Sequence, residues 1–108
     1  MSEEKQVKTG RGLNKEWIRT QLWEAKEELD GTLAKIVTDE EYDEGEFKIA
    51  MDHIYTHLNV AWNERNAKIV GNANAWLFPE DIAKELRAQV RWIKRKEKAR
   101  RRKKDSRG

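Results

Sequence analysis

Apolar residues return at three- and four-residue steps along three stretches of this 108-residue chain. That spacing matches the turn of an α-helix and places the apolar side chains on one face. No segment shows the apolar and polar alternation typical of a half-buried strand. The sequence therefore predicts an all-α fold with three amphipathic helices.

The first predicted helix follows Asn14, a residue type that suits a helix start. Its apolar stripe passes through Gly31, where a helix is weakened by about 1 kcal/mol relative to alanine. We expect one long helix here, although a break at this glycine stays open. The stripe that we expect to form core consists of Ile18, Leu22, Ala25, Leu29, Leu33 and Ile36.

The segment 38–41, Thr-Asp-Glu-Glu, matches a capping box and predicts that a second helix starts there. The stripe of this helix consists of Phe47, Met51, Ile54, Leu58, Ala61 and Trp62. Residues 71–74 predict a loop, and Pro79 suits the first turn of a third helix. The third stripe consists of Ile82, Leu86, Val90 and Ile93.

These helices predict either a three-helix antiparallel bundle or a long helical hairpin plus a third helix. The spacing also suits a coiled-coil hairpin that pairs with a second copy, so a homodimer is a further expectation. We divide the chain into a flexible N-terminal arm (1–13), a helical bundle domain (14–93) and a basic tail (94–108).

Charge is distributed unevenly. Residues 93–107 carry ten of the 23 basic side chains and two of the 20 acidic ones, whereas residues 1–93 hold thirteen basic and eighteen acidic side chains. Dense cationic segments attract nucleic acid because each neutralised phosphate releases counterions. The residues expected to bind nucleic acid are Trp92, for stacking on bases, and Lys94, Arg95, Lys98, Arg101, Arg102 and Lys104.

Five tryptophans are present, and they do not all fit the three stripes. Such residues either cover a thin bundle or form an interface, where tryptophan is enriched. Trp17, Trp23 and Trp76 are therefore candidates for contact with a protein partner.

His53 and His57 lie four residues apart on one helical face, a spacing that weakly suits a divalent metal. No third ligand is identifiable, so we expect hydrogen-bonded histidines, no metal and no other cofactor. The acidic cluster at residues 39–46 would need Glu24, Glu27 or Glu28 at the same level to resemble a metal-dependent phosphohydrolase. A helix start complemented by acidic side chains explains the cluster more simply.

Asn59, Asn63 and Asn66 lie away from the second stripe, and we expect them to form a polar ladder across helices. The run His57-Leu-Asn-Val-Ala-Trp-Asn63 resembles a segment of small uncharacterised bacterial proteins with the pattern His-Leu-Asn-x-Ala-Trp-Asn. The resemblance covers roughly residues 53–82 and implies one packed unit around this run. The resemblance implies no activity for this chain.

The leading interpretation is a non-enzymatic helical protein that binds nucleic acid or a ribonucleoprotein through its basic tail. The alternatives are a protein-interaction module, such as an adaptor or inhibitor, and a metal-dependent hydrolase; a tail that only aids solubility is the plainest reading. The chain has no cysteine and no apolar run that would span a bilayer. We therefore expect a cytoplasmic protein without membrane contact.

Overall fold

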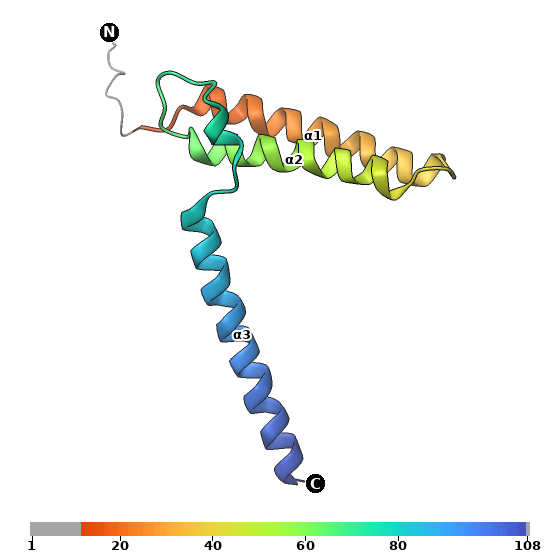
Figure 1. Ribbon diagram of the computed structural model, residues 1–108, viewed down its shortest axis with the longest axis vertical. Coiled ribbons are helices and arrows are strands. Elements are labelled where there is room, and N and C mark those ends of the chain that lie inside the picture. The colour runs from red at the N-terminus through yellow and green to blue at the C-terminus, as the bar shows by residue number, and fades with distance from the viewer. Residues whose placement is uncertain (1–11, 108) are drawn as a thin grey trace. The chain divides into compact units, whose positions relative to one another are not determined.

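The computed structural model describes residues 12–107, with side chains as far as residue 103. All regular elements in this part of the chain are helical, which confirms the all-α prediction (Figure 1). The elements are α1 (Lys15–Thr38), α2 (Glu44–Asn63), the 3₁₀ helix η2 (Ala73–Trp76) and α3 (Glu80–Arg107). The chain divides into two compact units, and the boundary falls between Phe78 and Pro79. The flexible arm predicted for residues 1–13 lies almost entirely outside the described residues.

Helix α1 starts as predicted. Asn14 is its N-cap, and the side-chain oxygen accepts a hydrogen bond from the Trp17 amide at 3.1 Å. The helix continues without a break through Gly31 to Thr38. Because Thr32 directly after Gly31 is buried, packing in the hairpin outweighs the low helix propensity of this glycine.

The predicted start of the second helix at Thr38 is wrong. Thr38 ends α1, and its hydroxyl donates to the Ala34 carbonyl at 2.8 Å. Asp43 is the N-cap of α2 instead, because its carboxylate accepts from the Glu46 amide at 2.9 Å. A second capping pattern at residues 43–46 thus follows the one at 38–41. A turn lies between them, in which the Asp39 carboxylate accepts from the Glu41 amide and the Asp39 carbonyl accepts from the Tyr42 amide.

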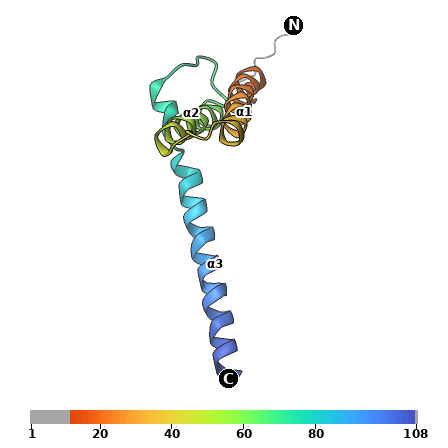
Figure 2. The ribbon, with the colours of Figure 1, turned by 90° about the vertical axis from the view of Figure 1, so that its right-hand side faces the viewer.

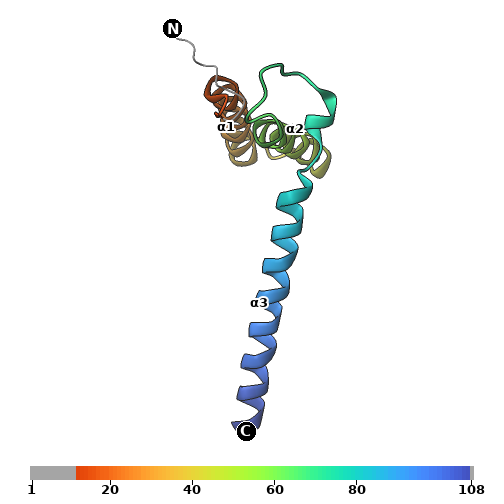
Figure 3. The ribbon, with the colours of Figure 1, turned by 90° about the vertical axis from the view of Figure 1, so that its left-hand side faces the viewer.

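Helices α1 and α2 form an antiparallel hairpin and lie side by side in Figure 1, Figure 2 and Figure 3. The buried side chains between them are mostly small or polar: Gln21, Ala25 and Thr32 on α1, and Ala50, Ile54 and Ala61 on α2. Small residues allow two helix axes to approach closely.

The predicted core stripe of α1 is therefore largely wrong. Ala25 is buried, but Leu22, Leu29, Leu33 and Ile36 are 46–61% exposed. On α2 the stripe is divided, because Ile54 and Ala61 are buried while Phe47, Leu58 and Trp62 are 37–43% exposed. The apolar pattern marked amphipathic helices correctly, yet the face that packs in the hairpin is rotated away from it.

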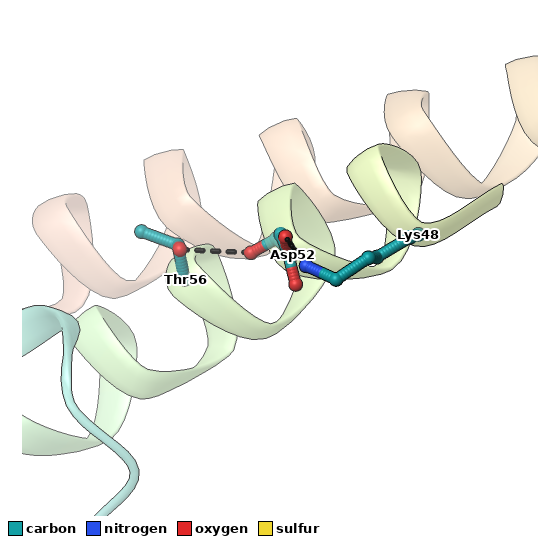
Figure 4. Close-up of polar contacts among 3 residues, drawn as sticks. All are labelled: Lys48, Asp52 and Thr56. Atoms are coloured by element: carbon teal, nitrogen blue, oxygen red, sulfur yellow. Dashed lines mark hydrogen bonds and ion pairs between the residues drawn. The ribbon is translucent and has the colours of Figure 1, made fainter. Parts of the chain in front are cut away.

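The outer side of α2 faces solvent and is polar (Figure 4). Lys48 and Asp52 form an i,i+4 ion pair at 3.0 Å, and the Thr56 hydroxyl donates to the Asp52 carbonyl at 2.8 Å. Because both charged side chains are more than 60% exposed, the pair stabilises the helix by only about 0.5 kcal/mol.

Helix α3 begins directly after Pro79, whose carbonyl accepts from the Ala83 amide at 3.0 Å. Glu80 and Asp81 occupy the first turn, where acidic groups favour the positive end of the helix dipole. The predicted core stripe is exposed here too, since Leu86, Val90 and Ile93 are 45–49% accessible. Within the described residues, no helix has the length and apolarity needed to cross a membrane.

Candidate functional site

Exposed basic side chains form a continuous row along α3, which we call the basic ridge: Lys84, Arg87, Arg91, Lys94, Lys98 and Arg102. Successive members are three or four residues apart. The eighteen residue steps from Lys84 to Arg102 amount to five complete helical turns, about 27 Å in length. Six cations therefore lie along one side of a single straight element.

The first half of the ridge was absent from the sequence-based prediction. Lys94, Lys98 and Arg102 were predicted, but the charge count that began at residue 93 omitted Lys84, Arg87 and Arg91. Their three- and four-residue spacing in the sequence was the signal that could have found them. Arg87 also contacts Glu80 at 3.3 Å, an ion pair between exposed side chains.

Trp92 lies on another side of α3. It is offset from Arg91 by one residue and from Lys94 by two, which turns it about 100° from Arg91 and about 160° from Lys94. Its ring is 56% exposed and lies 4.6 Å from the Lys96 ammonium group, a cation–π contact. Of the other predicted residues, Arg95 and Arg101 flank the ridge, and Lys104 lies beyond the described side chains.

A polar groove of about 510 Å³ lies between α1 and α2. It brings together acidic residues of both helices with the two histidines: Glu24, Glu27, Glu28, Glu46, His53 and His57. A hydrolase would need carboxylates of both helices in one place. Of the acidic cluster at residues 39–46, Glu46 alone lines the groove together with the glutamates of α1.

Each histidine has a different neighbour in the groove, and the hydrogen bond is made by His57. His57 Nδ1 lies 2.9 Å from Gln21 Oε1, and His53 Nδ1 lies 3.6 Å from Glu28 Oε1. Among the described residues, no three histidine, aspartate or glutamate side chains converge as metal ligands.

A polar network, which we call the loop anchor, fastens residues 65–79 to the end of α2. Its centre is Glu64, a carboxylate that is only 6% exposed. Oε1 accepts from Trp17 Nε1 at 3.0 Å, and Oε2 accepts from the amides of Gly71 at 3.1 Å and Asn72 at 3.2 Å. Gly71 has a φ of 101°, a backbone conformation that favours glycine.

The asparagines complete the loop anchor. Asn59 Nδ2 donates to the Trp76 carbonyl at 2.8 Å, and Asn63 Nδ2 donates to the carbonyls of Ala75 and Leu77. Asn66 Nδ2 donates to the Gly12 carbonyl at 2.9 Å. Asn59 and Asn63 thus connect α2 with carbonyls of η2 and of the residue after it, as the predicted polar ladder across helices requires. Asn66 lies outside this ladder, because its partner Gly12 precedes α1.

The tryptophans proposed for partner contact have different surroundings. Trp17 is partly buried and belongs to the loop anchor. Trp23 is 56% exposed beside Lys26, and Trp76 in η2 is 59% exposed. The last two are therefore accessible on the surface of the first unit.

Comparison with known proteins finds no matching family model, no matching curated protein and no matching solved structure.

Proposed function

We propose that this protein binds nucleic acid through the basic ridge of α3. The observation that supports the proposal best is the alignment of six exposed cations along about 27 Å of one helix. A straight row of this length suits the regular phosphates of a nucleic acid strand, and phosphate contacts need no base sequence.

Repulsion within the helix supports the same conclusion. Lys94, Lys98 and Arg102 follow each other at four-residue steps, and like charges at this spacing destabilise an isolated helix. Residues 91–103 hold nine basic side chains and a single acidic one, Glu97. A polyanion would remove this repulsion, so binding is expected to increase the helical content of α3.

The expected binding is steeply dependent on salt. If the ridge neutralises six phosphates, the slope of log affinity against log salt is about −5 for duplex DNA. A rise from 50 to 200 mM salt would then weaken binding roughly 1,000-fold.

Fluorescence anisotropy with single- and double-stranded DNA and RNA oligomers tests the proposal. A ridge variant carries Arg91→Gln, Lys94→Gln and Lys98→Gln. A control variant with the same net charge carries Lys96→Gln, Arg100→Gln and Lys103→Gln on other sides of the helix. We expect the ridge variant to reduce the salt slope by about 3, and the control variant to reduce it by less than 1.

Equal losses in both variants would mean that charge alone matters and would contradict the role of the ridge. No binding of the wild-type chain at low salt would overturn the proposed function. Trp92→Ala distinguishes single-stranded from double-stranded ligands. The ring lies off the ridge, so its loss is expected to weaken binding of single strands, whose bases can stack on it, and to leave binding of duplexes unchanged.

A further inference from the structure

The α1–α2 hairpin carries large apolar side chains on one side, which we call the apolar face. They are accessible by 37–61%, and they are Leu22, Leu29, Leu33 and Ile36 on α1 and Phe47, Leu58 and Trp62 on α2. Isolated apolar residues are ordinary on protein surfaces, but a contiguous set from two adjacent helices indicates an interaction site.

The two helices present these residues on the same side of the hairpin. On each helix, members of the apolar face directly follow residues of the hairpin contact, as Leu33 follows Thr32 and Trp62 follows Ala61. Residues that directly precede the contact, such as Glu24 before Ala25 and His53 before Ile54, converge on the polar groove instead. On both helices, the residues just before the hairpin contact lie in one groove. The residues just after the contact therefore lie together on the opposite side of the hairpin.

We propose that the apolar face binds the same face of a second copy, so that two hairpins form a four-helix bundle. Inside the hairpin the contacts come mostly from small or polar residues and Ile54, whereas the leucines and aromatic rings are exposed. That distribution suits a layer shared between two hairpins, with helices packed on both sides of it.

The charges at the two ends of the hairpin favour a second copy over an unrelated partner. The turn end has six carboxylates at residues 39–46, and no lysine or arginine occurs between Lys35 and Lys48. At the other end an apolar patch of α1 is bordered by Lys15, Arg19 and Lys26, and Lys26 already pairs with Asp30 at 2.9 Å. Lys15 and Arg19 therefore supply the remaining positive charge beside this patch. A two-fold axis across the long direction of the hairpin would bring the basic end of each copy to the acidic turn of the other.

This proposal does not depend on nucleic-acid binding by α3. Analytical ultracentrifugation of the full chain from about 1 to 200 µM tests it, since dimerisation follows mass action. We expect the mass to rise from 12.8 kDa towards twice that value as the concentration increases. High salt is expected to raise the dissociation constant by screening the end-to-end attraction.

Leu33→Glu and Phe47→Glu, one on each helix, are the test variants, and each is expected to raise the dissociation constant at least 100-fold. Ile69→Glu is the matched control, because Ile69 is 89% exposed in the loop and outside the apolar face. Far-UV circular dichroism verifies that the helices persist. A wild-type monomer over the whole range overturns the proposal and assigns the face to another occupant, and so does a dimer that neither test variant weakens.

Discussion

Replacing Glu64 with glutamine tests the loop anchor with almost no change in shape. The buried carboxylate accepts from three N–H groups, on Trp17, Gly71 and Asn72. A glutamine amide has one oxygen and one NH₂ group, and the NH₂ group cannot accept. The orientation that keeps both backbone amides bonded places the NH₂ group against the Trp17 indole N–H.

The expected cost follows from these contacts. A hydrogen bond to a charged acceptor contributes about 1.5–3 kcal/mol, and a buried donor without a partner costs about 1–3 kcal/mol. Losing the Trp17 bond and weakening the other two lowers the free energy of unfolding by about 3 kcal/mol. That is a large part of the roughly 5–15 kcal/mol by which a small domain is stable.

Urea unfolding followed by circular dichroism and tryptophan fluorescence measures this loss. Glu27→Gln, at an exposed position of α1, is the control and should change stability by less than about 0.5 kcal/mol. In a Trp17→Phe background, the cost of Glu64→Gln should fall by about 1–2 kcal/mol, since the indole donor is already gone. A loss below about 1 kcal/mol, or an undiminished loss in that background, would refute the reasoning.

Two glycines predict opposite effects of the same substitution in thermal unfolding. Gly71→Ala should destabilise the protein by about 1–2 kcal/mol because of its positive φ, whereas Gly31→Ala should stabilise it by about 0.5–1 kcal/mol, since an added Cβ meets nothing within 4 Å. Effects of the same sign would contradict this account. Asn59→Ala should cost about 1–2 kcal/mol in urea unfolding, and Asn59→Asp should cost more, because a carboxylate oxygen would face the Trp76 carbonyl. An aspartate variant as stable as the alanine variant would show that the amide donation is unimportant.

Local signals in the sequence determined the helical class and much of the element order. Asn14 capped the first helix, the apolar spacing carried it through Gly31, and Pro79 marked the start of the third. These features depend on neighbours within about one turn, so no tertiary information is needed to interpret them. The start of α2 was mistaken because the capping pattern at 38–41 was used, whereas the N-cap is Asp43, five residues later.

The two candidate sites also differ in whether local sequence is enough to predict them. The basic ridge depends only on the period of a single helix, so its three- and four-residue spacing can be found in the sequence. Lys84, Arg87 and Arg91 were missed only because the basic residues were counted from residue 93 onward. The loop anchor could not be predicted, because Trp17 and Glu64 are 47 positions apart and meet only through the hairpin.

The sequence by itself determined the three long helices, where two of them begin and where positive charge is concentrated. It predicted a loop at residues 71–74, where η2 begins at Ala73. Only the tertiary structure decided that mostly small or polar residues close the hairpin, that the leucine stripe of α1 stays exposed and that Asn59 and Asn63 donate to carbonyls of η2 and of Leu77. The physical reason is that hydrophobic periodicity defines an apolar side but not its partner. The partner depends on the turn and on the approach of two helices, which no single stretch of the chain encodes.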